Sequence, residues 1–112
     1  MARTTLETLQ HHLKALGAQD IDAIVSDYTD ESVLITPDST VRGTSDLRDF
    51  FTDALKAMPG FVDAIALSRQ EIEGDIAYIV WTAPGFMTIG TDTFLVRDGK
   101  IAVQTFTGQP VS

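Results

Sequence analysis

The chain has 112 residues, of which 44% are hydrophobic and 21% charged. This composition is typical of one globular domain, residues 1–112, and excludes a disordered or fibrous protein. Acidic residues outnumber basic ones by 16 to 8, giving a formal net charge of −8. Because such a chain repels phosphate groups, we expect it to bind neither nucleic acid nor an anionic membrane. The absence of cysteine excludes disulfides and sulfur-ligated metals.

The sequence predicts neither a signal peptide nor a membrane span. Its first four residues contain no apolar core, and the longest uncharged stretch, 76–91, is too short for a bilayer and is interrupted by Pro84-Gly85. We therefore expect a cytoplasmic protein.

The first half of the chain predicts helices. Thr4 followed by Glu7 is a capping-box signal, and leucines then recur at helical spacing as far as Gly17. Asp20 is the expected N-cap of a second, short helix, whose apolar side extends to Tyr28.

A third helix is expected to begin at Thr44 or Ser45 and to end at Pro59-Gly60. The second half predicts strands, because Gly74-Asp75 and Asp98-Gly99 are typical of tight hairpin turns. The β-rich stretches of the chain are 32–36, 61–72, 76–83, 86–97 and 101–107.

Three helices followed by four consecutive antiparallel strands predict an α+β fold, with the helices on one face of a sheet. In the stretch 76–81, apolar side chains point to both faces of the sheet. The outer face is therefore expected to be covered, either by a second copy in a homodimer or by the sheet wrapping round within a monomer.

Four stretches carry a resemblance to a known superfamily: HLKALGAQDIDAI at 12–24, YTDESV at 28–33, RGTSDLRDFF at 42–51 and TDTFLVRDGKI at 91–101. In this order they resemble the nuclear transport factor 2-like superfamily, and within it the SnoaL-like polyketide cyclases and ketosteroid isomerases. The resemblance implies a cone, in which a curved antiparallel sheet wraps around the helices and encloses an apolar pocket. It also implies a homodimer through the outer sheet face. It says less about activity, since this fold hosts isomerases, cyclases, hydratases and non-catalytic binders.

Two residues are candidates for stabilising charge on a ligand oxygen. His12 lies at the edge of the apolar stripe of the first helix, where the ketosteroid isomerase pattern has a hydrogen-bond-donating tyrosine, whereas His11 lies on the polar side. The alternative is a structural His12 bonded to a backbone carbonyl. Asp92 matches the family's buried aspartic acid, which an apolar pocket keeps protonated; otherwise it is a solvated strand-end carboxylate.

The proton acceptor expected of an isomerase is missing from its usual place. The matching position is Thr36, whose hydroxyl is too weak a base. Asp38 replaces it if the turn at Pro37 folds inward, and otherwise lies in a surface turn. Gln104 stands where SnoaL-like cyclases often have a histidine, and glutamine orients a ligand without transferring protons.

Aromatic side chains are expected to line the pocket, although Trp81 faces a dimer partner in the alternative arrangement. Tyr28 is notable because its buried hydroxyl needs a partner. The acidic run 27–31 lacks the spacing of a calcium loop and is interpreted as a solvated helix end, so no metal site is expected. The residues expected to bind a ligand are Tyr28, Thr36, Phe51, Tyr78, Phe94 and Gln104.

These observations predict a protein that binds a small, largely apolar molecule carrying a carbonyl or hydroxyl group, with no cofactor. As an enzyme it would catalyse isomerisation, cyclisation or dehydration through an enol-like intermediate. His12 and Asp92 would then stabilise charge on oxygen, and Asp38 would be the base. The alternatives are a non-catalytic carrier, a protein-interaction module, or a core filled by aromatic side chains.

Overall fold

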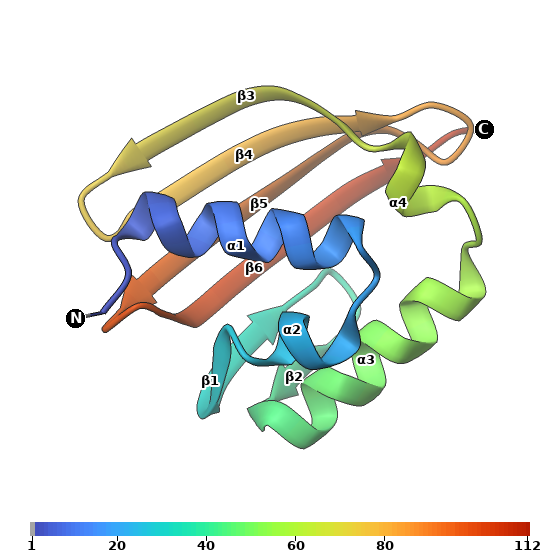
Figure 1. Ribbon diagram of the computed structural model, residues 1–112. Helices are drawn as coiled ribbons and strands as arrows, with labels where there is room; N and C mark the ends of the chain where they lie inside the picture. Colours follow the sequence, from blue (N-terminus) through green and yellow to red (C-terminus); the bar gives the residue numbers. More distant parts are fainter. Residues whose placement is uncertain (1) are drawn as a thin grey trace.

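A computed structural model describes residues 2–112; Met1, the first residue of the expected domain, lies outside the described part. The described residues form one curved six-stranded sheet, and the helices lie on its inner face (Figure 1). The helices are α1 (Thr5–Gly17), α2 (Ile21–Val25), α3 (Gly43–Ala57) and α4 (Phe61–Ala64). The strands are β1 (Tyr28–Ile35), β2 (Thr40–Arg42), β3 (Ala66–Glu73), β4 (Ile76–Ala83), β5 (Met87–Arg97) and β6 (Lys100–Pro110).

The sheet has the strand order β2-β1-β6-β5-β4-β3. The last four strands in the chain form an antiparallel meander, as the hairpin signals predict. β1 joins β6 in parallel, with Tyr28 beside Ile101 and Leu34 beside Gln104. The α+β fold class is thus confirmed, while this one strand pair departs from the expected antiparallel arrangement.

The helix caps predicted from the sequence are present in the structure. The Thr4 hydroxyl accepts a hydrogen bond from the Glu7 backbone N–H at 3.1 Å, and the Glu7 carboxylate accepts one from the Thr4 N–H at 2.8 Å. The Asp20 carboxylate accepts the Ala23 N–H at 3.1 Å and starts α2. The turn between β5 and β6 places Asp98 and Gly99 at φ values of 52° and 73°, the left-handed conformation of tight hairpins.

Three elements differ from the sequence expectation. Tyr28 does not lie on α2 but begins β1, which is therefore longer than the predicted strand. Residues 61–64, expected to be extended, form the short helix α4, so the sheet faces four helices. The three-residue strand β2 was not predicted, because a strand this short has too few residues to show an alternating pattern.

The hydrophobic core lies between the inner face of the sheet and the helices. In β4 every second residue is buried, and Trp81 belongs to this buried set. Trp81 therefore points inward, which settles the alternative that placed it against a dimer partner. The largest fully buried side chains include Leu9, Ile24, Leu34, Phe94 and Ile101.

Candidate functional site

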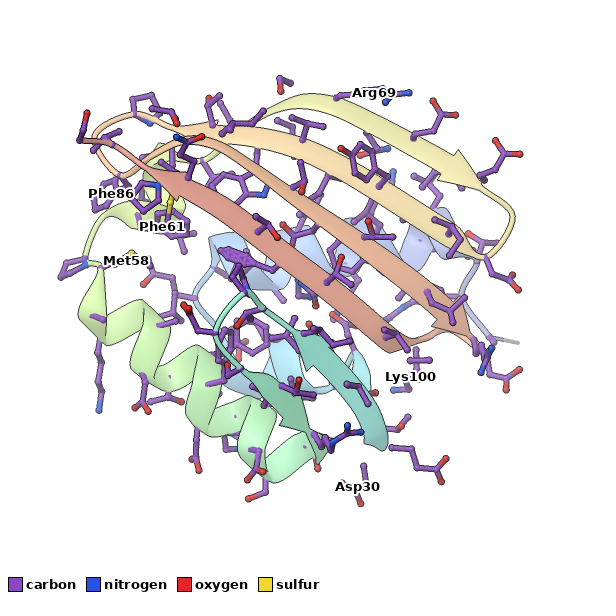
Figure 2. All side chains as sticks on the ribbon, turned by 180° about the vertical axis from the view of Figure 1, so that it is seen from behind. Asp30, Met58, Phe61, Arg69, Phe86 and Lys100 are labelled. Atoms are coloured by element: carbon purple, nitrogen blue, oxygen red, sulfur yellow. The ribbon has the colours of Figure 1, made fainter. Side chains whose placement is uncertain are left out.

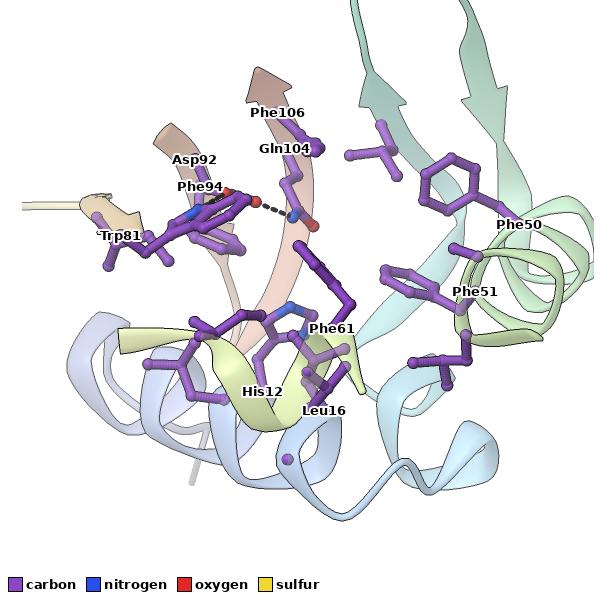
Figure 3. Close-up of a pocket in the computed structure, with 18 of the residues that line it drawn as sticks. His12, Leu16, Phe50, Phe51, Phe61, Trp81, Asp92, Phe94, Gln104 and Phe106 are labelled. Carbon is purple, nitrogen blue, oxygen red and sulfur yellow. Dashed lines mark hydrogen bonds between the residues drawn. The ribbon is translucent and has the colours of Figure 1, made fainter. Parts of the chain in front are cut away.

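A cavity of about 360 Å³ lies inside this core, between the inner face of the sheet and helices α1, α3 and α4 (Figure 3). Two of its lining residues, Gly17 at the end of α1 and Leu67 on β3, are exposed, which indicates where the cavity approaches solvent. Its wall is almost entirely apolar. The lining residues are His12, Leu13, Leu16, Gly17, Leu34, Phe50, Phe51, Ala54, Leu55, Met58, Phe61, Val62, Ile65, Leu67, Ile79, Trp81, Asp92, Phe94, Gln104 and Phe106.

Aromatic rings gather at the end of the cavity beside α4. Phe61 of α4 packs edge-on against Trp81, with ring centroids 5.6 Å apart, and against Phe86 at 5.7 Å. Phe106 stacks on Trp81 with centroids 5.9 Å apart. Figure 2 shows Met58, Phe61 and Phe86 at the same end of the molecule. The packing of Phe61 onto Trp81 explains why residues 61–64 turn into a helix rather than extend a strand.

Asp92 on β5 is the acidic group of this wall. The Trp81 indole N–H donates a hydrogen bond to Asp92 Oδ1 at 2.8 Å, and the Gln104 amide donates to Oδ2 at 2.8 Å (Figure 3). The Tyr28 hydroxyl in turn donates to Gln104 Oε1. A connected polar network therefore runs from the cavity wall to the buried start of β1.

The strand register explains this arrangement. Gly90 lies opposite Trp81, and a Cβ atom at Gly90 would lie only 2.1 Å from Trp81 Cζ2. Because glycine has no side chain, the indole ring lies across β5 and its N–H reaches Asp92. The network thus depends on a glycine whose backbone φ is ordinary but whose missing side chain gives the ring its space.

Burial raises the pKa of the Asp92 carboxyl, whereas the hydrogen bonds from Trp81 and Gln104 lower it, and the net shift is upward. Burial, together with the charges of Asp92 and Asp27, raises the pKa of the Tyr28 hydroxyl well above its ordinary value. Burial thus favours the protonated form of Asp92 more than in water, while Tyr28 stays protonated.

His12 lies on the opposite side of the cavity, on α1. Only 2% of its surface is exposed, and its ring packs against Phe94 at 5.4 Å, Tyr28 at 5.9 Å and Phe51 at 6.2 Å between centroids. Burial and the neighbouring His11 lower the pKa of His12 to about 4. His12 is therefore neutral at physiological pH, which excludes a charged imidazolium as its resting form.

Asp27 behind His12 was missed by the sequence analysis. It belongs to the acidic run interpreted as solvated, but it is 0% exposed, so that interpretation is wrong for this residue. Asp27 Oδ1 is 2.7 Å from His11 Nδ1 and 3.3 Å from the Arg3 guanidinium. Burial raises the pKa of Asp27, and the charges of His11, Arg3 and Lys100 oppose this shift. No pattern in the sequence distinguishes Asp27 from its exposed neighbours, because the contacts that bury it come from β6 and the N-terminal segment.

The structure brings five of the predicted site residues to the cavity: His12, Phe51, Asp92, Phe94 and Gln104. Tyr28 is not among the lining residues and reaches the site only through its bond to Gln104.

Three predicted site residues lie elsewhere, and these assignments are corrected. Thr36 and Asp38 belong to the β1–β2 turn, where the Thr36 hydroxyl accepts the backbone N–H groups of Asp38 and Ser39. Asp38 is exposed, so the turn does not fold inward. Tyr78 alternates with the buried residues of β4 and lies on the outer face. Four aromatic residues of the cavity are absent from the predicted ligand set: Phe50, Phe61, Trp81 and Phe106. Their aromatic character is evident in the sequence, but spacing alone does not show which of them face the cavity.

Within residues 2–112, no group of three or more histidine, cysteine, aspartate or glutamate side chains is arranged to hold a metal ion. The helices of that same part of the chain are all too short or too polar to cross a membrane.

The family model of the SnoaL-like domain matches residues 9–104. A search of curated proteins finds no match. Among solved structures, a candidate polyketide cyclase from Sinorhizobium meliloti is 19% identical with a TM-score of 0.74, covering 88% of this chain and 92% of that one.

Two further solved structures have related folds. A candidate ketosteroid isomerase from Kribbella flavida is 14% identical with a TM-score of 0.76, covering 96% of this chain and 79% of that one. An LEH-like epoxide hydrolase from M. tuberculosis is 17% identical with a TM-score of 0.72, covering 94% and 82%. At such identities the similarity shows the fold and not the activity. The family match covers most of the chain, and the chain belongs to the SnoaL-like domain family.

Proposed function

We propose that this protein binds a small, largely apolar molecule in the cavity, with an oxygen atom of that molecule at Asp92. One observation carries the proposal: a carboxyl group is held by two fixed N–H donors at the wall of an otherwise aromatic and aliphatic cavity. The volume of about 360 Å³ is near the lower end of the range for small-molecule sites, which favours a compact ligand.

The chemistry of Asp92 limits what the ligand carries. Trp81 donates a hydrogen bond to one carboxyl oxygen of Asp92 and Gln104 donates to the other. Each of these oxygens has a second lone pair that can accept a further hydrogen bond. The ionised group accepts a hydrogen bond from a ligand hydroxyl, and the protonated group donates one to a carbonyl. Because the chain has a net charge of −8, a neutral ligand is favoured over an anionic one.

Trp81 gives a direct test, since it is the chain's single tryptophan and contacts Asp92. We expect its fluorescence to change saturably on titration with neutral cyclic enones or alcohols, and not with the corresponding carboxylates. Asp92→Asn should weaken binding about tenfold or more, the usual effect of losing a hydrogen bond to a charged group. Asp38→Asn is the matched control in an exposed turn and should bind normally. Absence of saturation with every neutral ligand, or equal weakening by Asp38→Asn, would contradict the proposal.

A second candidate function, acid–base catalysis, is favoured by one specific observation. The same cavity holds a carboxyl group whose pKa is raised and an imidazole whose pKa is lowered, and perturbed pKa values of this kind cluster at functional sites. For an enone, a base would remove a proton from the carbon beside the carbonyl, and the C–H electron pair would form the enol. Asp92 would hydrogen-bond to the oxygen, and the proton would return at another carbon.

Deuterium exchange into a bound enone, followed by mass spectrometry, tests this second candidate. Enzymatic exchange should be lost in Asp92→Asn and kept in Asp38→Asn. Binding without exchange would instead identify a non-catalytic carrier with the same cavity. The polyketide cyclase, ketosteroid isomerase and epoxide hydrolase folds are compatible with either function.

A further inference from the structure

Two buried polar atoms face each other behind the cavity. His12 Nδ1 is 3.8 Å from Asp27 Oδ2, and within the described part of the chain neither atom has a hydrogen-bond partner. Both side chains are almost completely buried, at 2% and 0% exposed. Unpartnered buried polar atoms are rare and costly, so their meeting at one point calls for an explanation.

The position of Asp27 is fixed from several directions. Its backbone carbonyl accepts the Ile101 N–H at 2.7 Å, which ties the end of α2 to β6. Its carboxyl oxygen Oδ1 lies within hydrogen-bond distance of His11 Nδ1 and of the Arg3 guanidinium. These partners favour the ionised carboxylate and oppose the burial that raises the pKa of Asp27. In the ionised form, Oδ2 is a negatively charged atom 3.8 Å from His12 Nδ1.

A carboxylate at this position selects one form of the neutral imidazole. A lone pair on Nδ1 would face the negative Oδ2, whereas an N–H there would point its positive end at the carboxylate. The favoured tautomer therefore carries its proton on Nδ1. Nε2 then has a free lone pair, and the imidazole ring that carries it lines the cavity (Figure 3).

We propose that Asp27 holds His12 in the Nδ1–H tautomer and so makes His12 Nε2 the proton acceptor of the cavity. This inference rests on the proposed function for its chemical role, and it names the base that neither Thr36 nor Asp38 can supply. It also reverses the role expected from the sequence, because His12 then accepts a hydrogen bond where a donor was expected. Asp27 is a positioning residue, since it contacts His12 and not the ligand.

The proposed step is a proton transfer from the ligand to His12. A proton on the carbon beside a ligand carbonyl moves to Nε2, and the C–H electron pair becomes the new C=C bond while the carbonyl oxygen gains charge. His12 becomes an imidazolium whose Nδ1–H faces Asp27, which compensates the new positive charge. The distance of 3.8 Å is longer than a hydrogen bond, and such contacts often shorten only when the ligand is bound.

The tautomer can be measured in the ligand-free protein. Long-range ¹H–¹⁵N NMR spectra distinguish a protonated from an unprotonated ring nitrogen, and we expect the Nδ1–H form to be the major tautomer of wild-type His12. In Asp27→Asn the amide can either accept from or donate to Nδ1, so this preference should largely disappear. Asp38→Asn, which changes an exposed carboxyl group in the β1–β2 turn, is the control and should leave the His12 tautomer unchanged.

A wild-type His12 found as Nε2–H, or as imidazolium at neutral pH, would overturn the proposal without any variant. So would an unchanged tautomer in folded Asp27→Asn; if that variant does not fold, the wild-type spectrum decides. Failure of the proposed function appears separately, as absent ligand binding in the Trp81 titration. With an exchanging enone, His12→Gln should abolish exchange while keeping binding, and Asp27→Asn should lower the rate and shift its pH profile.

Discussion

At the scale of single residues, Gln104 has the most connected role in the cavity. Its amide N–H donates a hydrogen bond to Asp92, and its amide oxygen accepts one from the Tyr28 hydroxyl. Gln104 therefore both orients the carboxyl group and provides the acceptor for the buried hydroxyl of Tyr28. A glutamine at this position cannot move protons itself, but it fixes the geometry of a neighbour that can.

Replacing Gln104 with leucine should therefore have two effects. The free energy of unfolding should fall by about 1–3 kcal/mol, because the buried Tyr28 hydroxyl loses its acceptor. The pKa of Asp92 should rise further, because one of the hydrogen bonds that lowers it is lost. Urea unfolding and NMR titration of Asp92 measure these effects. Gln70→Leu, an exposed change on β3, is the control, and an equal loss of stability there would contradict the explanation.

His12 predicts a pH dependence of stability. Its pKa is about 4 in the folded protein and 6.5 as the ordinary value, so between these values the unfolded chain binds a proton that the folded chain does not. The free energy of unfolding should therefore fall as pH decreases from 6.5 toward 4, by up to about 1.4 kcal/mol per pH unit.

Asp27 and Asp92 contribute with the opposite sign, since burial raises both pKa values and acid relieves the cost of their charges. Urea unfolding at a series of pH values should accordingly compare the wild type with His12→Gln, in which the histidine contribution is absent. Parallel pH profiles for the two proteins would show that His12 is not neutral when folded.

The sequence identifies His12 and Asp92 because helical spacing and strand alternation place each beside an apolar stripe. Asp27 could not be identified in this way. It is buried by long-range contacts with Arg3 and Ile101, and local spacing does not encode which distant segments meet.

At the scale of elements, the junction between β4 and β5 shapes the cavity. Trp81 lies over Gly90, where Phe106 stacks on the indole and Phe61 packs against it edge-on. The alternation of β4 predicts that Ile79 and Trp81 share a face, but not that this face is the inner one. Similarly, residues 61–64 are apolar enough for a strand, but they form a helical turn in which Phe61 packs against Trp81 and Phe86.

Gly90→Ala should displace the indole, because the added methyl group would lie 2.1 Å from a ring carbon. We expect a loss of about 1–3 kcal/mol of stability from overpacking. The fluorescence of Trp81 should also change, as its bond to Asp92 breaks. Gly17→Ala is the matched control, since a Cβ at Gly17 meets nothing within 4 Å. A Gly90→Ala protein with native stability and native fluorescence would refute this account of the strand register.

At the scale of the whole molecule, the outer face of the sheet is less apolar than the sequence suggests, because threonines occupy much of it. One apolar row nevertheless crosses four neighbouring strands, as the register shows. This outer row consists of Ile76 on β4, Leu95 on β5, Val103 on β6 and Val33 on β1.

We propose that the outer row forms the centre of a homodimer, in which two copies cover each other's apolar side chains. Leu95→Glu should then shift the protein to monomers in sedimentation equilibrium. Ala57→Glu adds the same charge at the exposed end of α3 and should not. Because each copy is strongly negative, the wild-type dimer should also tighten with ionic strength. A wild-type monomer at every salt concentration would exclude the dimer.

The parallel pairing of β1 with β6 has a consequence for how the protein is made. β6 lies between β1 and β5, so β1 can join the larger part of the sheet only after the ribosome has released residues beyond Lys100. The hairpins of β3, β4 and β5 can form earlier, because each joins strands that are adjacent in the sequence. We therefore expect Tyr28, the first residue of β1, and Asp27 just before it to reach their native neighbours on β6 later than the residues of these hairpins do.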